Sequence, residues 1–202
     1  MPEDSLQSNP AEALPQTTAP DQPRSQKMIR FILDVVETLI ISLVLFAGIN
    51  AITVRIRVDG HSMEPTLQNG ELVIVNKLAY RFSAPKAGDV IVFRFPRDPD
   101  QEYIKRIIGL PGDEVKIANG QVFINGKQAA EPYIAAPPAY NMIWQVPEGT
   151  VFVLGDNRNN SSDSHDWGPV AMEYVVGKAV FIYWPPQAWG AIRSYDLSAA
   201  SP

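Results

Sequence analysis

The sequence predicts a mostly β protein, in which an antiparallel β-sheet domain is preceded by one transmembrane α-helix and a disordered N-terminal tail. Three observations support this fold class. Short apolar runs rich in β-branched residues recur from residue 53 onward, separated by Gly, Pro and Asn-Gly turns. An uncharged apolar segment, residues 38–54, precedes them. The first residues are rich in Pro, Ser, Gln and Thr and hold few large apolar side chains.

Composition limits the classes of function that fit this chain. Its 202 residues can form one domain with a real core plus appendages. The net charge of −5 offers no basic footprint, so we expect no nucleic-acid partner. The absence of cysteine excludes disulfides, a thiolate nucleophile and a cysteine-based zinc site. The chain has only two histidines, His61 and His165, so a multi-histidine metal site is not expected either.

The N-terminal tail, residues 1–26, is predicted to be disordered. Five prolines stand there among Ser, Gln, Thr and Ala: Pro2, Pro10, Pro15, Pro20 and Pro23. A segment of this composition cannot bury enough apolar surface to offset the conformational entropy that folding removes.

Residues 27–54 are predicted to form a transmembrane anchor helix. The charge-free run over residues 38–54, with the turn that precedes it, reaches the roughly 20 residues that a helix needs to cross a bilayer. Three basic residues come before this run: Arg24, Lys27 and Arg30. By the positive-inside rule they place the N-terminus in the cytoplasm and the domain outside, in a single-pass protein of the cell membrane. Arg55 and Arg57 follow the run and weaken this asymmetry.

Two other interpretations of the apolar segment are open. A cleaved signal peptide has a shorter apolar region and a small-residue cleavage site, and no clean site follows the run in this chain. A buried core helix is the second alternative. An uncharged run beside a disordered tail favours the anchor over both.

The remainder, residues 55–202, is predicted to be a β-rich domain of about ten strands at short spacing. The clearest strand patterns cover residues 53–58, 71–76, 89–95, 103–108, 114–117, 121–124, 151–154 and 176–183. Asn119-Gly120 and Asn125-Gly126 are strong signals of hairpin turns. Residues 127–149 carry several prolines and are predicted to form a long loop or a small excursion from the domain.

Ser62 stands where the first predicted strand turns. The alternating stretch over residues 53–58 meets Gly60, and Pro65 follows, so the strand must end in a turn. A serine on such a turn can point its hydroxyl into open space, and the glycine two residues earlier lets another backbone approach closely. A serine hydroxyl is a poor nucleophile until a neighbouring base accepts its proton. On this stretch alone, an ordinary turn serine is the simpler interpretation.

Lys105 is a candidate for that base. It lies in an apolar stretch, and strand alternation places it on one face and Arg106 on the other, so whichever face is buried holds a cation. Burial lowers the pKa of a lysine because the charged form is desolvated, and the neutral amine can then act as a base. The alternative is that both residues are edge-strand charges that oppose aggregation.

Residues 155–169 form a loop dense in short polar side chains, directly after a predicted strand. Such side chains hydrogen-bond to their own backbone and build rigid, irregular loops. A polar loop of this length on a β core is more often functional than idle, and the alternative is a solvated surface loop.

In this order and behind a membrane anchor, the three stretches closely resemble type I signal peptidases, which are membrane-bound serine endopeptidases with a Ser/Lys dyad. The resemblance is carried by Gly60-His-Ser-Met-Glu-Pro-Thr-Leu67, Gly70-Glu-Leu-Val-Ile-Val-Asn-Lys77, Gly88-Asp-Val-Ile-Val-Phe93, Tyr103-Ile-Lys-Arg-Ile-Ile-Gly-Leu-Pro-Gly-Asp113, and Gly155-Asp-Asn-Arg158 through Trp167-Gly-Pro-Val170. One such segment alone is a weak signal, whereas the whole set in order over residues 58–170 is specific.

The resemblance implies that Ser62 is the nucleophile and Lys105 the general base. It makes Ser161 the hydrogen-bond partner that orients the lysine amine. The residues implied to stabilise the active-site loop are Asp156, Arg158 and Asp163. The residues implied to line the shallow pockets for small side chains are Val58, Met63, Leu67, Tyr103 and Ile104.

Two positions depart from the family pattern. Some members carry a serine two residues before the nucleophile, whose hydroxyl helps to form the oxyanion hole, and this chain has Gly60 there, as another branch does. The hole is then expected to rely on backbone N–H groups, including that of Ser62. The arginine that usually closes the Asp-Ser-Arg run is replaced by His165, so an ion pair within the loop is expected to be weaker or pH-sensitive.

The implied function is removal of signal peptides from secretory precursor proteins at the lipid bilayer, by cleavage after a small residue at an Ala-x-Ala type site. Lys105 accepts the Ser62 proton, an acyl-enzyme forms, and water activated by Lys105 hydrolyses it, with no metal and no cofactor.

Three alternatives are open. A Ser/His/Asp triad built on His165 with Asp163 or Asp166 is the rival within the protease class. Self-cleaving transcriptional repressors share the dyad and a related β fold, but they need a DNA-binding N-terminus. A membrane-anchored β domain that only binds exported proteins is the third alternative, and in that case changing Ser62 has no effect.

Overall fold

The computed structural model describes residues 24–197 of the chain. Most of the predicted tail lies outside the described residues. The first element, α1, runs from Arg24 to Ile52. It therefore begins within the predicted tail and ends before the predicted limit of the anchor, because Thr53 and Val54 belong to the first strand. Contacts divide the chain into two compact units, one ending at Phe46 and the other beginning at Ala47.

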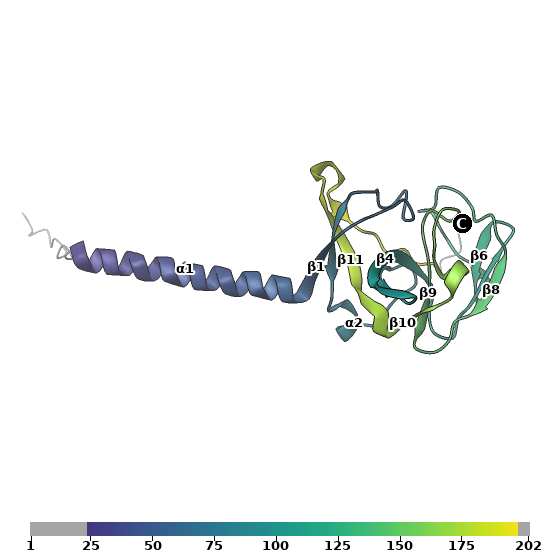
Figure 1. Cartoon of the computed structure of the whole chain (residues 1–202), viewed down its shortest axis with the longest axis horizontal. Coiled ribbons are helices and arrows are strands. Elements are labelled where there is room, and N and C mark those ends of the chain that lie inside the picture. Colours follow the sequence, from purple (N-terminus) through teal and green to yellow (C-terminus); the bar gives the residue numbers. More distant parts are fainter. Residues whose placement is uncertain (1–23, 198–202) are drawn as a thin grey trace, which may run out of the picture. The chain divides into compact units, whose positions relative to one another are not determined.

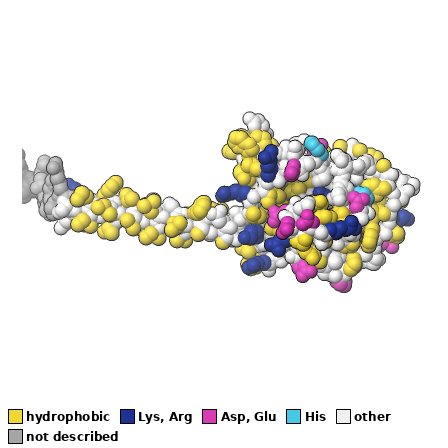
Figure 2. Space-filling view, in the orientation of Figure 1, with side chains coloured by type: hydrophobic (Ala, Val, Ile, Leu, Met, Phe, Trp, Pro, Cys, Tyr) yellow, Lys and Arg dark blue, Asp and Glu magenta, His cyan; other side chains and the backbone are white. Residues whose placement is uncertain are grey.

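The helix α1 exposes apolar side chains along its length. Figure 2 shows hydrophobic side chains along the visible face of this helix, and its large apolar residues from Met28 to Ile52 are exposed. Within the described part of the chain, Ser25–Ile52 is the one segment long and apolar enough to cross a bilayer. The hydroxyl of Thr38 donates to the Asp34 carbonyl at 2.8 Å, so it finds its partner inside the helix. A helix that is apolar on its exposed surface needs an apolar environment.

The strands after α1 form two antiparallel sheets (Figure 1), as the alternating pattern predicts. The larger sheet has the strand order β1-β2-β11-β3-β4-β9-β10, and β12 pairs with β11. Its strands are β1 (Thr53–Arg57), β2 (Leu72–Asn76), β3 (Val90–Phe95), β4 (Asp98–Gly109), β9 (Thr150–Leu154), β10 (Val170–Ala171), β11 (Val175–Trp184) and β12 (Gly190–Ala191). The prediction of a mostly antiparallel β fold is confirmed.

The smaller sheet has the order β7-β6-β5-β8. Its strands are β5 (Glu114–Ala118), β6 (Gln121–Ile124), β7 (Lys127–Gln128) and β8 (Met142–Gln145). The turn between β5 and β6 is the predicted Asn119-Gly120 turn, with φ of 54° and 75°, the left-handed values that this hairpin turn requires. Asn125 and Gly126 likewise have positive φ, 51° and 77°, between β6 and β7.

Residues 127–149, predicted to form a long loop or a small excursion, hold two short strands, β7 and β8, that were not predicted from the sequence. β8 pairs with β5, yet three of its four residues are exposed, so its sequence carries no clear alternation. Its pairing is decided by β5 rather than by its own pattern. Short helical turns complete the fold: α2 (Ala79–Phe82), α3 (Ser164–Trp167), η1 (Met172–Tyr174) and η2 (Pro186–Ala188).

The turn after β1 is held by the apolar residues on both sides of Ser62. Val58, Met63 and Leu67 are buried in one cluster with residues of β2, β3 and β4. Burying each of these side chains contributes about 1.5–3 kcal/mol. The turn is therefore part of the core, and the serine on it has a fixed position.

Candidate active site

Ser62 and Lys105 come together although they are 43 positions apart in the sequence. Lys105 Nζ lies 2.8 Å from Ser62 Oγ, and it also donates to the carbonyl of Ile104 at 3.0 Å. The Tyr103 ring lies beside the same nitrogen, with its centroid 5.2 Å away. Within the described residues, Ser62 Oγ has no other hydrogen-bond partner. The hydroxyl is thus paired with the amine alone.

Lys105 is only 4% exposed, and its surroundings lower its pKa from 10.5 to about 8. Burial is the main cause, because the ammonium form loses its water. The carboxylates of Asp163 and Asp156 act in the opposite direction but do not cancel the effect of burial. With this pKa, roughly one Lys105 side chain in ten is neutral at pH 7, compared with roughly one in 3,000 for an ordinary lysine.

The backbone around Ser62 is held from both sides. Gly60 has φ of 94°, a conformation that strains any residue with a side chain, so this turn favours glycine. Its N–H donates to Asn69 Oδ1 at 3.0 Å. On the other side, the Asn157 N–H donates to the Ser62 carbonyl at 3.0 Å, and the Asn157 side chain donates to the His61 carbonyl at 3.1 Å. The polar loop therefore fixes the main chain of the serine.

The Ser62 N–H group has no acceptor within the described part of the chain. A free backbone N–H beside the serine hydroxyl can donate to an oxygen that becomes negative during attack on a carbonyl. The loop can approach this closely only because residue 155 is a glycine: a Cβ at Gly155 would overlap the Ser62 carbonyl oxygen and Ser161 Oγ.

Ser161, which the family resemblance assigns to orienting the lysine amine, lies against Gly155. Its Oγ is buried and has no hydrogen-bond partner within the described residues. The expected hydrogen bond to Lys105 is therefore absent, and the amine contacts the Ile104 carbonyl instead.

Asp156 anchors the loop to β4 through Arg106. The two side chains form a double hydrogen bond, with Arg106 Nε 2.8 Å from Asp156 Oδ1 and Arg106 Nη2 2.7 Å from Asp156 Oδ2. Both side chains are fully buried. The hydroxyl of Thr66 also donates to Asp156. Breaking such a buried pair by removing one partner typically costs about 3–5 kcal/mol, because the other charge remains without compensation.

Arg158 pairs with Glu131, which comes from the segment between β7 and β8. Arg158 Nη1 donates to Glu131 Oε2 at 2.9 Å, and Arg158 Nε donates to the Gly155 carbonyl at 3.1 Å. Burial alone would lower the pKa of Arg158, but the Glu131 carboxylate more than offsets burial, so this pKa is raised. The pair ties the polar loop to the smaller sheet.

Asp163 receives the third set of loop contacts. The Gly155 N–H donates to its Oδ2 at 2.9 Å, and His165 Nδ1 lies 2.7 Å from its Oδ1. His165 Nε2 lies 3.0 Å from Asp166 Oδ1, and the His165 ring stacks on Tyr140 with centroids 4.3 Å apart. His165, which stands where the resemblance predicts an arginine, therefore keeps an acid–base contact with Asp163.

A cleft of about 940 Å³ opens at Ser62 and Lys105. Tyr103 and Ile104, both expected to contact substrate, line it. Val58, Met63 and Leu67, expected at the same pockets, are core residues and do not line this cleft. The cleft also has lining residues that the sequence did not single out: Ile56, Arg57, Asp59, Gln101, Glu102, Asn160 and Ser162.

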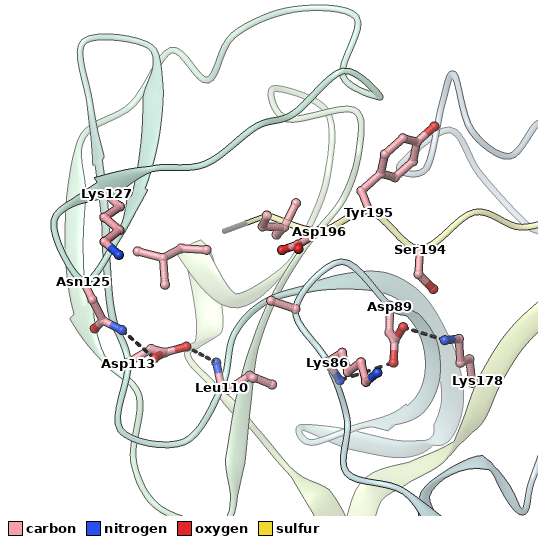
Figure 3. Close-up of a pocket in the computed structure, with 13 residues that line it drawn as sticks. Lys86, Asp89, Leu110, Asp113, Asn125, Lys127, Lys178, Ser194, Tyr195 and Asp196 are labelled. Atoms are coloured by element: carbon pink, nitrogen blue, oxygen red, sulfur yellow. Dashed lines mark hydrogen bonds and ion pairs between the residues drawn. The ribbon is translucent and has the colours of Figure 1, made fainter. Parts of the chain in front are cut away.

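A second cavity, of about 690 Å³, lies elsewhere in the domain (Figure 3) and offers different chemistry. Two of its charged side chains form an ion pair, with Lys178 Nζ 2.6 Å from Asp89 Oδ1, and the neutral Asn125 side chain donates to Asp113 at 2.7 Å. No serine paired with an amine lines it. The cleft at Ser62 is therefore the candidate active site.

Sequence reasoning missed Arg106 and Glu131 as partners of the loop. Arg106 could be identified as a cation on one face of a strand, but nothing local indicates that it is buried against Asp156. Glu131 stands in a proline-rich segment whose pairing with Arg158 depends on the tertiary fold.

Residues 30–184 match the protein family described as signal peptidase, peptidase S26. This chain belongs to that family. It is 40% identical over 180 residues to a probable signal peptidase I-1 of Synechocystis sp., with 85% of this chain and 92% of that protein covered. It is 38% identical over 189 residues to a signal peptidase I of Leptolyngbya laminosa, with 88% and 91% covered.

A solved structure of a signal peptidase I from Enterococcus faecalis V583 is 34% identical, with a TM-score of 0.45 over 48% of this chain and 97% of the solved chain. Membership of the family makes the chain a serine endopeptidase. The predicted resemblance to type I signal peptidases is thereby confirmed.

Proposed function

We propose that this chain removes signal peptides from secretory precursor proteins, with Ser62 as the nucleophile and Lys105 as the general base. The observation that carries the proposal is the 2.8 Å contact between Lys105 Nζ and Ser62 Oγ. The neutral amine accepts the hydroxyl proton while Ser62 Oγ attacks the carbonyl carbon at the cleavage site. The resulting ammonium then donates its proton to the leaving amine, and an acyl-enzyme remains. Lys105, neutral again, activates the water that hydrolyses this ester.

The tetrahedral oxyanion is stabilised by backbone donors, since Gly60 has no side chain to offer. The Ser62 N–H is the donor that the described contacts leave without an acceptor. Such a donor typically contributes about 3–4 kcal/mol to the transition state. Cleavage follows a small residue at an Ala-x-Ala type site, as the family resemblance implies, and Tyr103 and Ile104, which line the cleft, are the residues proposed to contact it.

The positions of the histidines support the Ser/Lys dyad over a Ser/His/Asp triad. His61 is exposed, and its Nδ1 lies 2.8 Å from Glu64. His165 lies between Asp163 and Asp166 and does not line the cleft. Within the described residues, neither histidine hydrogen-bonds to Ser62 Oγ.

The proposed organisation places the protein in the cell membrane with a single span. The helix α1 serves as the anchor, the tail over residues 1–26 faces the cytoplasm, and the catalytic domain, residues 55–202, is extracytoplasmic beside the lipid bilayer. The exposed apolar surface of α1 and the basic residues that precede its uncharged part support this arrangement.

The test is cleavage of a synthetic precursor by the full chain in detergent, followed by mass mapping of the cut. Ser62→Ala should lower the rate by at least about a thousandfold, because the nucleophile is removed. Ser194→Ala, a change of an exposed serine away from the cleft, is the matched control and should keep the rate. Cleavage by Ser62→Ala at the control rate, or a cut that does not follow a small residue, would refute the proposal.

A further inference from the structure

We propose that a groove beside the end of α1 binds the headgroup of an anionic lipid. This groove, here called the basic groove, has a volume of about 590 Å³. Three cations line it, Lys77, Arg81 and Arg94, and Glu173 is the only carboxylate among its lining residues. The basic groove thus has an excess of positive charge, although the chain as a whole has a net charge of −5.

The three cations of the basic groove have no partner within the described residues. No ion pair or side-chain hydrogen bond involves Lys77, Arg81 or Arg94, and all three side chains are exposed. Some cations of the domain are paired, such as Lys178 with Asp89 at 2.6 Å. The charges of the basic groove are therefore free to meet an anion from outside the protein.

The groove is built on fixed backbone from several elements. Lys77 directly follows β2, Arg81 lies in α2 and Arg94 in β3. The Lys77 N–H donates to the Ile52 carbonyl at 3.0 Å, which holds this cation at the end of α1. Gly177 also lines the groove, and a Cβ there would overlap the Asn76 carbonyl, so β11 packs tightly against the end of β2. The backbone that carries these side chains is therefore fixed before a ligand binds.

The position of the basic groove favours a lipid over a soluble anion. Ala51, in the last turn of α1, lines the groove. This step rests on the proposed anchoring: if α1 spans the bilayer, the membrane surface lies at the end of the helix, whatever its tilt. Basic side chains next to a membrane surface attract anionic headgroups.

Phe82 supplies a second, independent observation. It follows Arg81 at the end of α2, and its side chain is 85% exposed. An exposed aromatic side chain beside cations suits the boundary between headgroups and acyl chains, where apolar and charged groups are both satisfied. A site for a free inorganic anion needs no such apolar neighbour.

The proposal is tested on the full chain in detergent micelles by counting retained lipids with native mass spectrometry. The probes are phosphatidylglycerol, which is anionic, and phosphatidylcholine, which is zwitterionic. The unaltered protein should retain phosphatidylglycerol in preference. Lys77→Gln, Arg81→Gln and Arg94→Gln should each lower its affinity about fivefold, and the affinity for phosphatidylcholine should not change.

A triple variant at exposed cations elsewhere in the domain is the matched control: Lys116→Gln with Lys127→Gln and Arg193→Gln. It changes the net charge as much as the triple variant of the basic groove, which combines Lys77→Gln, Arg81→Gln and Arg94→Gln, and it should retain phosphatidylglycerol normally. Equal retention by the two triple variants would show that overall charge alone attracts the lipid, and the proposal would fail. Phe82→Ser should also weaken retention, whereas full displacement of phosphatidylglycerol by equimolar inorganic phosphate would identify a free-anion site instead.

This test is separable from that of the proposed function. The triple variant of the basic groove should cleave a short soluble peptide in detergent at the unaltered rate, because none of its residues lines the cleft at Ser62. If the unaltered chain does not cleave the peptide, the proposed peptidase mechanism is refuted, and the result on lipid binding is unaffected. A full chain that stays soluble without detergent would refute the anchor and the lipid site together.

Discussion

The buried amine of Lys105 should set the acid limb of the activity. Its ammonium form cannot accept the Ser62 proton, so turnover requires the neutral amine. Because burial lowers this pKa to about 8, kcat/KM should rise as the pH increases, with a midpoint near 8. Below the midpoint, the rate should fall about tenfold for each pH unit, as the neutral fraction does. A histidine base would instead give a midpoint near its ordinary pKa of about 6.5.

The size of the expected effect on the neutral fraction of Lys105 follows from the environment of its amine. The fall of the Lys105 pKa from 10.5 to about 8 means that the folded domain disfavours the ammonium by about 3 kcal/mol. At pH 7 this raises the neutral fraction roughly 300-fold. The same burial lowers stability at pH 7, because the unfolded chain holds the proton at no such cost. Between about pH 8 and 10.5 the unfolded chain binds a proton that the folded chain lacks, so this penalty shrinks as the pH rises.

Three variants decide which residue is the base. Lys105→Met should abolish cleavage and leave the thermal midpoint at pH 7 unchanged or higher, because a disfavoured charge is removed from the interior. Lys105→Arg should also be inactive, because a guanidinium stays protonated. His165→Ala, the control, should keep substantial activity. If Lys105→Met keeps most of its rate while His165→Ala loses it, or if the acid limb has its midpoint near 6.5, the dyad is wrong and the triad replaces it.

Further predictions concern stability, specificity, topology and membrane contact. Asp156→Asn should destabilise the protein by about 3–5 kcal/mol in urea unfolding, because Arg106 stays buried without a counter-charge, and a loss under about 1 kcal/mol would contradict this. Precursors with Phe in place of Ala at the cut should be cleaved about 10- to 200-fold more slowly, and equal rates would count against a small-residue pocket. Protease added to sealed, right-side-out vesicles should digest the chain beyond residue 60, and protection of that part would reverse the topology. Trp184 and Trp189, which are 54% and 64% exposed, should change fluorescence when lipid vesicles are added to the catalytic domain, and an unchanged spectrum would show that they do not contact lipid.

The parts of the fold that could be predicted from the sequence are those fixed by local patterns. β2, β3 and β9 are runs of β-branched and apolar residues bounded by turns, and the structure has each of them within a residue or so of its expected limits. The Asn119-Gly120 turn follows from the left-handed conformation that these two residues tolerate. β8 could not be predicted in this way, because most of its residues are exposed and its sequence does not alternate between apolar and polar residues. It is a strand because it pairs with β5.

The candidate site also has residues that could be predicted from the sequence and contacts that could not. Ser62 and Lys105 could be assigned because the family resemblance implies their roles, although each has a simpler interpretation in its local context alone. The contacts that hold the loop could not, since Arg158 meets a glutamate 27 positions away and Arg106 meets an aspartate 50 positions away. Such pairs depend on which strands become neighbours, and no local pattern reports that. For Ser161 the resemblance implied a contact that the structure does not contain: its hydroxyl has no hydrogen-bond partner within the described residues.

Lys105 and Arg106 are adjacent on β4, and both are buried, yet the fold treats them in opposite ways. Arg106 donates to Asp156, to the Gly88 carbonyl at 2.7 Å and to the Arg193 carbonyl at 3.1 Å, and its guanidinium lies 4.1 Å from the Tyr133 ring centroid. Lys105 has no carboxylate partner within the described residues. A guanidinium cannot release its proton, so its burial is tolerated only when its donors are satisfied. An amine can respond to burial by losing its proton, and leaving it without a counter-charge is what keeps the base of the proposed reaction available near neutral pH.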